Sequence, residues 1–164
     1  MDYLWTPWRY RYIAQAAKVT DCIFCDLPAA NRDEETLIVL RGMRNFVILN
    51  RYPYTAGHVM IVPYAHTADF ARLDPETTVE MISLAQRVQA ALGGIYRPEG
   101  YNLGMNLGRA AGAGIADHLH LHLLPRWAGD TNFMTTVGET RLEPEDLSTT
   151  YEKLRGALGA EPAL

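Results

Sequence analysis

The residues of this chain best suited to chemistry are three histidines at alternating positions, His118, His120 and His122, with leucines between them. Alternation with a period of two is typical of a β-strand with two unlike faces, so we expect the imidazoles on one face and the leucines in a core. An imidazole can attack as a nucleophile or transfer a proton near neutral pH. The row therefore predicts a catalytic site in which His120, the central ring, is the nucleophile.

Two other interpretations of the histidine row are open. It can be a solvent-facing polar strand, although such strands usually carry Thr, Lys or Glu. It can also be a metal site with imidazole ligands only. In each case Pro125, which has no N–H to donate to a sheet, should end the strand.

A loop rich in glycine and alanine, residues 108–116, leads directly into the row. Glycine lets backbone N–H groups approach a phosphate closely, so Gly112 and Gly114 are candidate phosphate ligands, and a plain hairpin loop is the alternative. A P-loop is excluded, because no Lys-Ser/Thr pair follows the glycines. Arg109 and Arg126 can add positive charge beside the row, or can simply be solvated.

The two cysteines of the chain form a C-x-x-C at Cys22 and Cys25. This spacing alone fits half of a zinc site, a redox pair or two buried thiols. No thioredoxin-like strand–motif–helix pattern surrounds it.

The elements that must position these groups follow from hydrophobic periodicity and breaker residues. We expect a hairpin of strands 36–40 and 45–50, further strands at 58–62 and 101–107, and the histidine strand as the fifth. A helix should begin at Asp74–Pro75, a favoured cap and first position, and end at Gly93–Gly94. A second helix is expected over 144–158. Helical spacing predicts a core stripe on the first helix: Met81, Leu84, Ala85, Val88, Ala91 and Leu92.

Size and charge narrow the class of protein. A chain of 164 residues is one domain, and we expect an aromatic, basic arm at residues 1–20 followed by a single domain at 21–164 that includes a C-terminal tail. The net charge of −4 argues against nucleic acid as a partner. No apolar run reaches membrane-spanning length and the start does not resemble a signal peptide, so we expect a cytoplasmic protein without a membrane partner.

The motif His-Leu-His-Leu-His-Leu-Leu resembles the signature of the histidine triad (HIT) nucleotide hydrolases and transferases. Further segments are similar to the same family: residues 4–9, 22–25, 50–53, 57–59 and 125–130. The pattern after the row is most similar to the branch that contains diadenosine tetraphosphate phosphorylases. The resemblance implies an α+β, HIT-like fold, with an antiparallel sheet of about five strands, one main helix and a C-terminal helix. It also implies a homodimer or higher homo-oligomer, and the arm or the tail at 127–141 is expected to cross to the partner.

The resemblance implies nucleotidyl transfer through a covalent nucleotidyl-His120, with His118 and His122 as further catalytic residues. Asn50 and His58 match positions that line the nucleotide site of the family, while Phe46 and Ile48 are either a base slot or plain core. We expect a dinucleoside polyphosphate substrate such as diadenosine tetraphosphate, with orthophosphate as acceptor. Hydrolysis or phosphoramidate cleavage is the main alternative, and a non-catalytic nucleotide-binding protein or a metal-dependent hydrolase are others.

The C-x-x-C together with two distant histidines resembles a further pattern, which is found in zinc-containing HIT proteins and in the related galactose-1-phosphate uridylyltransferases. It implies that Cys22, Cys25, His66 and His118 bind one structural zinc and leave His120 free; reduced cysteines without metal are the alternative. We expect no organic cofactor. Many family members carry a glutamine four residues before the first triad histidine, where this chain has Gly114.

Overall fold

A computed structural model describes residues 22–131 and 145–159 of the chain. The expected N-terminal arm lies outside the described residues, as does most of the expected tail. Within the described part, no helix has the length and apolar character needed to cross a membrane.

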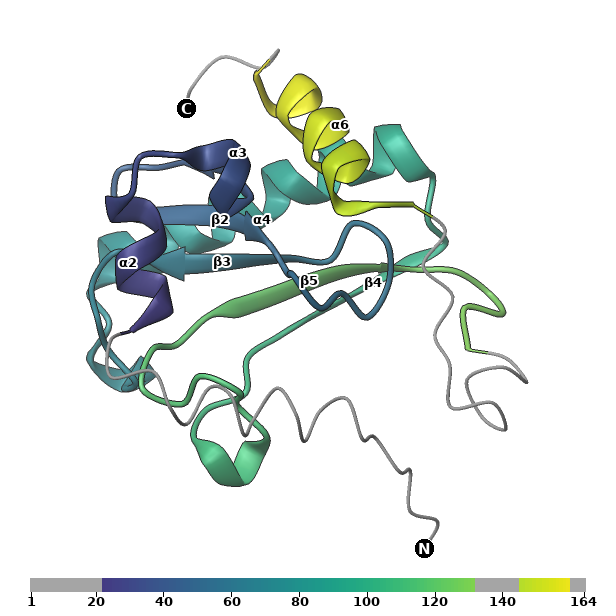
Figure 1. The fold of residues 1–164 in the computed structure, drawn as a ribbon. Coiled ribbons are helices and arrows are strands. Elements are labelled where there is room, and N and C mark those ends of the chain that lie inside the picture. Colours follow the sequence, from purple (N-terminus) through teal and green to yellow (C-terminus); the bar gives the residue numbers. More distant parts are fainter. Residues whose placement is uncertain (1–21, 132–144, 160–164) are drawn as a thin grey trace, which may run out of the picture.

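Five strands form one antiparallel sheet in the order β1-β2-β3-β5-β4 (Figure 1). Strand β5, which carries the end of the histidine row, therefore lies inside the sheet between β3 and β4. The strands are β1 Ile38–Arg41, β2 Asn45–Leu49, β3 Val59–Pro63, β4 Gly100–Gly104 and β5 Leu121–Arg126.

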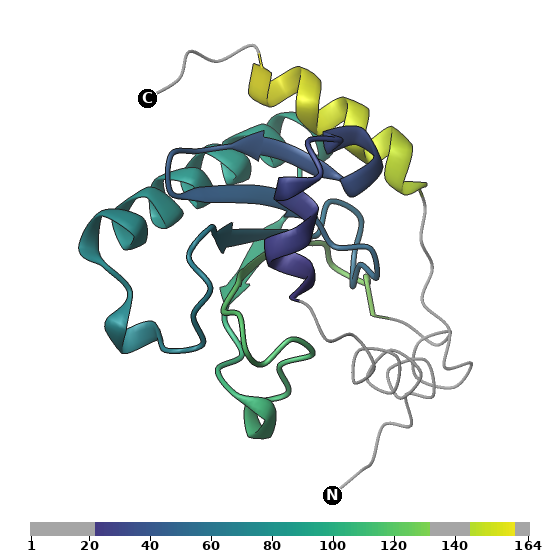
Figure 2. The same cartoon turned by 60° about the vertical axis from the view of Figure 1, so that its left-hand side comes forward.

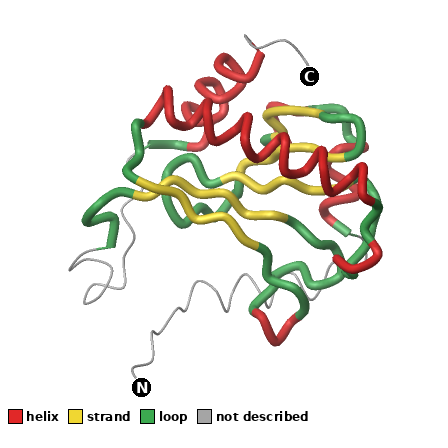
Figure 3. The backbone as a smooth tube through the Cα atoms, turned by 180° about the vertical axis from the view of Figure 1, so that it is seen from behind, coloured by secondary structure: helices red, strands yellow, loops and turns green. Residues whose placement is uncertain are grey.

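Helices cover both faces of this sheet. The long helix α4 crosses one face, which is seen in Figure 3, and α6 packs beside it. The short helix α2 lies against the opposite face (Figure 2). The helices are α2 Ile23–Ala29, α3 Asp33–Thr36, α4 Pro75–Tyr96 and α6 Leu147–Gly159, with single 3-10 turns η1 Phe70–Arg72 and η2 Arg109–Ala111. The expected α+β class, with a five-stranded antiparallel sheet, one main helix and a C-terminal helix, is thus confirmed.

The strands divide their side chains between two apolar layers, as alternation requires. Val59 and Ile61 of β3 pack with the α4 stripe, whereas Met60 and Val62 face α2. Leu119, Leu121 and Leu123 join the α4 layer, so the histidines between them project to the α2 side. The expected two-faced histidine row is confirmed.

Two predicted boundaries around the site are wrong. Strand β5 begins at Leu121, after His118 and His120, and continues through Pro125 to Arg126. A proline is accommodated there because β3 pairs with β5 only at residues 121–123, so the missing N–H of Pro125 lies beyond that ladder.

The predicted end of the main helix is also wrong. Asp74 caps α4 as expected, accepting the Thr77 N–H at 2.9 Å, but the helix continues past Gly93–Gly94 to Tyr96. Arg97, which follows Tyr96, caps the end of the helix in a left-handed conformation. At Gly93 an added Cβ would lie 3.4 Å from the Tyr101 hydroxyl, an ordinary contact distance, so the packing does not require a glycine there.

Further predictions differ from the structure at the ends of strands. Thr36 belongs to α3 and not to the first strand, and β4 stops at Gly104 and not at residue 107. Helices α2 and α3 had no counterpart in the predicted elements. The seven residues of α2, with Pro28 inside, are too few to show helical periodicity.

Candidate active site

The three histidines of the row meet different surroundings on the α2 side of the sheet. His118 is fully buried, His120 is 6% exposed and His122 is partly exposed. Their imidazoles turn to separate partners: His118 to the cysteines, His120 to a backbone carbonyl and His122 to His58. A metal site built from the row alone does not fit this arrangement.

The central imidazole is held in one tautomer by its own backbone. Nδ1 of His120 lies 3.0 Å from the carbonyl oxygen of His118. A carbonyl can only accept, so Nδ1 carries the proton and donates it. Burial lowers the pKa of His120 and the hydrogen bond to His118 partly offsets this, so the ring is neutral at pH 7. Its Nε2 therefore holds a free lone pair, which is the state that a nucleophile requires.

His122 neighbours the nucleophile candidate and is also neutral. Its ring centroid lies 4.8 Å from that of His120. Burial lowers the pKa of His122 to about 4, and repulsion from the His120 ring, once that ring is protonated in acid, lowers it further. On its other side, Nδ1 of His122 lies 2.9 Å from Nε2 of His58.

The structure brings Asn50 and His58 together with His122. Nδ2 of Asn50 lies 3.3 Å from Nδ1 of His58, and the Tyr54 ring stacks on His122 with centroids 6.4 Å apart. His58 itself is 1% exposed. The residues expected at the nucleotide site from resemblance thus form one connected group with the row.

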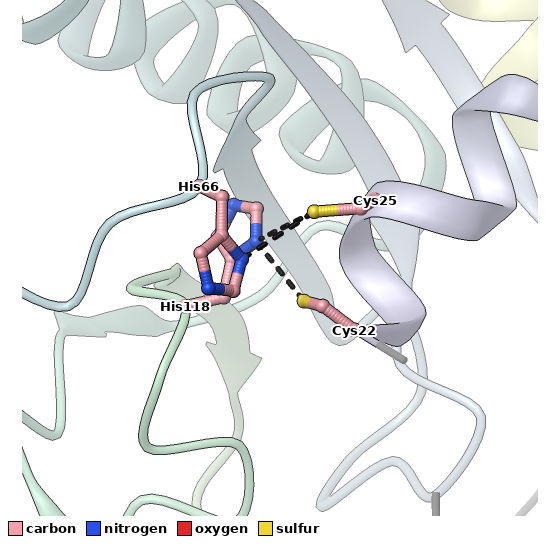
Figure 4. Close-up of side chains that lie close together, drawn as sticks. All are labelled: Cys22, Cys25, His66 and His118. Carbon is pink, nitrogen blue, oxygen red and sulfur yellow. Dashed lines mark hydrogen bonds between the residues drawn. The ribbon is translucent and has the colours of Figure 1, made fainter. Parts of the chain in front are cut away.

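Two cysteines and two histidines converge at the N-terminus of α2 (Figure 4). The ligand atoms of Cys22, Cys25, His66 and His118 all lie within 4.8 Å of one another. Nδ1 of His118 is 3.2 Å from Sγ of Cys22 and 3.7 Å from Sγ of Cys25. Nδ1 of His66 is 3.4 Å from Sγ of Cys25.

This donor set fits a tetrahedral zinc ion. Thiolate and imidazole ligands at usual bond lengths lie about 3.4–3.8 Å apart around tetrahedral zinc, close to the separations found here. Nε2 of His118 lies 2.9 Å from the Pro63 carbonyl oxygen, so its proton is on Nε2 and Nδ1 faces the cysteines as a free ligand. A backbone acceptor behind a ligand histidine is the usual support of a zinc site.

A side chain that the sequence did not single out links this cluster to the row. Phe24 lies between the two cysteines and is 3% exposed. Its ring lies 5.5 Å from that of His118 and 5.0 Å from that of His120. The sequence signal that could have identified Phe24 is its position as an aromatic residue between the two cysteines of the C-x-x-C. Phe46 and Ile48 lie with Phe24 in the same buried layer, and their use as a base slot stays a prediction.

The candidate cations lie on either side of the row in sequence. Arg109 begins the 3-10 turn η2 in the loop before β5 and is exposed, while Gly112 ends that turn with φ +87°, a conformation that favours glycine. Gly114 is partly buried in the same loop. Arg126 is bound by Asp130 through contacts of 2.5 and 2.7 Å and donates to Asn102 at 2.6 Å. Its charge is thus largely neutralised at the end of β5.

A five-stranded sheet with an alternating histidine row beside a Cys/His cluster defines the class of histidine triad proteins. The model of the HIT domain matches residues 31–129, and the chain belongs to this family. It is 36% identical to an AP-4-A phosphorylase of Mycobacterium tuberculosis, over 97% of this chain and 85% of that protein.

Two further comparisons bear on the site. The chain is 31% identical to an adenosine 5'-monophosphoramidase of Schizosaccharomyces pombe, over 81% of this chain and 95% of that protein. A Zn-bound histidine triad family protein from Mycobacterium smegmatis has a similar structure, with a TM-score of 0.69 and 30% identity over 85% of this chain and 94% of the other.

Proposed function

We propose that this protein transfers a nucleotidyl group from a dinucleoside polyphosphate through a covalent intermediate on His120. The observation that carries the proposal is the hydrogen bond from Nδ1 of His120 to the His118 carbonyl oxygen, because it leaves the lone pair on Nε2. An imidazole fixed in this way is ready to attack without first losing a proton.

The reaction proceeds in two displacements. Nε2 of His120 attacks the α-phosphorus, a P–N bond forms, and the bond to the leaving nucleotide breaks. An acceptor then attacks the same phosphorus and the P–N bond breaks. With diadenosine tetraphosphate, ATP leaves first and orthophosphate takes the adenylyl group to give ADP. The identity with an AP-4-A phosphorylase supports this substrate and this acceptor.

Groups around His120 are expected to stabilise the charge that develops on the phosphate. His122 is a neutral donor beside the attacking ring, and the backbone N–H groups near Gly112 and Gly114 can approach the equatorial oxygens. Arg109 adds a cation in the same loop. Arg126 is paired with Asp130, so it could bind the phosphate only if this ion pair opened. Asn50 is the candidate contact to the nucleoside.

A second candidate function uses the same intermediate with water as the acceptor. The relative named as an adenosine 5'-monophosphoramidase supports a phosphoramidate substrate for this alternative. The two functions share the role of His120 and differ only in the second displacement.

We also propose that Cys22, Cys25, His66 and His118 hold one structural zinc ion. The ion would tie the N-terminus of α2 to the start of the histidine row, leaving His120 outside the coordination sphere. The convergence of two sulfur and two nitrogen atoms supports this site, and so does the similarity to a Zn-bound HIT protein.

Analysis of the products with and without orthophosphate tests the acceptor. Diadenosine tetraphosphate turned over in millimolar phosphate should give ADP and ATP in equal amounts, at a rate that rises with phosphate. AMP and ATP as products, at a rate indifferent to phosphate, would show that water is the acceptor. The same assay on adenosine 5'-phosphoramidate tests the second candidate substrate.

A further inference from the structure

The apolar layer beneath α2 extends over only part of the sheet face that carries the histidine row. Within the described part of the chain, the buried members of this layer come from α2 and from strands β1 to β3 alone. Helix α2 lies over β2 and β3 (Figure 1). Strand β5 is the next strand after β3, and β4 is the last. The histidine row therefore lies where the covered half of this face ends.

His122 has unlike neighbours on its two sides. On the β3 side the Tyr54 ring stacks on it, with the ring centroids 6.4 Å apart. On the β4 side its partner in the ladder is Gly104. Directly paired residues of antiparallel strands point their side chains to the same face, with Cβ atoms about 4.5–5.5 Å apart. A side chain at position 104 would therefore stand beside the His122 imidazole, and the glycine leaves that room open.

The space above Gly104 is accessible from outside. An added Cβ at this position would meet no atom of the described chain within 4 Å. Gly104 is exposed, and so is Asn102, the neighbouring residue of β4 on the same face. Asn102 pairs with Leu124, which is partly buried. His122, Gly104, Leu124 and Asn102 thus form an open strip of sheet beside the row, which we call the β4 shelf.

Neither backbone conformation nor packing requires a glycine at position 104. Gly104 is not among the described glycines with a positive φ, so its conformation is one that other residues adopt. A glycine weakens a strand, and a β-branched residue suits an exposed strand position better. Glycine within a strand often marks the close approach of a ligand or of another backbone. The strand gives up stability here at the residue that pairs with the histidine row, which favours a ligand in this space.

We propose that the β4 shelf receives the leaving part of the substrate, and that Gly104 determines how large this part can be. The inference rests on the proposed nucleotidyl transfer and adds a site for the leaving nucleotide. With the α-phosphorus at His120 and the nucleoside near Asn50, the rest of a dinucleoside polyphosphate has to extend away from the covered half of the face. The β4 shelf gives it room without disturbing the apolar layer. A substrate with a very small leaving group does not need the shelf.

Gly104→Val fills the shelf and tests the proposal with two substrates that share the adenylyl group. Diadenosine tetraphosphate releases ATP in the first displacement, whereas adenosine 5'-phosphoramidate releases only ammonia. We expect kcat/KM for the tetraphosphate to fall about 10- to 100-fold, because the valine side chain clashes with the leaving nucleotide. The value for the phosphoramidate should change by less than about 3-fold. Gly104→Ala should give a smaller effect in the same direction.

Gly100→Val is the matched control. Gly100 lies on the same strand and face, an added Cβ would likewise meet no atom within 4 Å, and its φ is not positive. It pairs with Arg126 and lies about 13 Å along the strand from Gly104, so both substrates should be turned over as by the wild type. Thermal unfolding and light scattering of each variant establish that fold and assembly are kept. Because valine favours a strand, Gly104→Val should be at least as stable as the wild type.

Several results would overturn the proposal. They are an unchanged preference between the two substrates in Gly104→Val, an equal loss for both, and an equal effect of Gly100→Val. Loss of assembly together with activity would assign Gly104 to a contact with a second copy of the chain and would also contradict the shelf.

Equilibrium binding separates the shelf from the proposed reaction, because it needs no turnover. In a His120→Ala background, Gly104→Val should weaken the binding of diadenosine tetraphosphate about 10-fold or more and leave that of AMP unchanged. A wild-type protein that cleaves neither substrate would refute the proposed reaction, and the binding difference would still decide on the shelf. Equal binding of the tetraphosphate with and without the valine would refute the shelf alone.

Discussion

The carbonyl oxygen of His118 accepts a hydrogen bond from Nδ1 of His120 at 3.0 Å, while the imidazole of the same His118 belongs to the Cys/His cluster. One residue thus joins the metal-site candidate to the nucleophile candidate through its main chain. Phe24, held between the two cysteines, packs on both rings. The cluster and the histidine row are one structural unit, and their stabilities should be coupled.

The first prediction concerns the zinc site. Protein purified without a histidine tag should contain about one zinc per chain, and Cys22→Ser or Cys25→Ser should lose it, because each removes one of four ligands. We expect either variant to lose several kcal/mol of unfolding free energy, as usual when a structural metal is lost. Elemental analysis and thermal unfolding measure both effects.

The matched control for the zinc prediction is Ile23→Ala. Ile23 lies inside the same C-x-x-C but is 44% exposed, so zinc content should stay unchanged. Wild-type protein without zinc, and cysteine variants as stable as the wild type, would contradict the site.

The second prediction is a loss of stability in acid caused by His122. Its pKa is about 4 in the folded protein against an ordinary 6.5, so the unfolded chain binds more protons between these values. The free energy of unfolding must therefore fall as the pH falls below 6.5, and this contribution levels off below about 4. Denaturant titrations of the wild type and of His122→Gln at several pH values should show a smaller fall in the variant. Equal falls in the two proteins would mean that His122 is not buried in its neutral form.

The third prediction separates the two arginines near the row. Arg109→Ala should raise the KM for the polyphosphate substrate, because an exposed cation in the glycine loop is lost, and leave stability nearly unchanged. Arg126→Ala should cost about 1 kcal/mol of stability, because it removes a two-contact pair with Asp130. Steady-state kinetics and unfolding of both variants decide between these roles. A rise in KM with Arg126→Ala alone would assign the substrate contact to Arg126.

The fourth prediction is a homodimer formed through the β4 edge of the sheet. Leu103 of β4 is 53% exposed at this edge. At the opposite edge, formed by β1, Nη1 of Arg155 donates to the Val39 carbonyl at 3.2 Å and so occupies a backbone acceptor that another strand could use. Leu103→Glu should give a monomer in light scattering. Val79→Glu, on the exposed side of α4, should leave the assembly intact. A monomeric wild-type protein at micromolar concentration would refute the dimer.

The features predicted correctly from the sequence are those that depend on a short local pattern of residues. The alternation at residues 118–123 predicted which side chains face the core, and the Asp74–Pro75 pair predicted where the main helix begins. Helix α2 was missed because a seven-residue helix containing Pro28 has no periodic signal. Gly93–Gly94 misled the prediction of the helix end, since the helix continues through both glycines to Tyr96.

The site was predictable as a set of residues but not as a set of contacts. Resemblance named Cys22, Cys25, His66 and His118 together, and these four do converge. The hydrogen bond between His58 and His122 spans 64 positions and depends on the pairing of β3 with β5. No local pattern records which ring nitrogen carries a proton, because that follows from partners which only the fold brings together.

The most direct test of the central claim is the stereochemical course at the α-phosphorus. Diadenosine tetraphosphate with one sulfur on the reacting α-phosphorus, as a single diastereomer, would be turned over in the presence of orthophosphate. The thio-substituted ADP that forms would then be analysed by phosphorus NMR. Two displacements through nucleotidyl-His120 predict overall retention of configuration. Inversion would mean a single direct displacement, and would contradict a covalent role for His120.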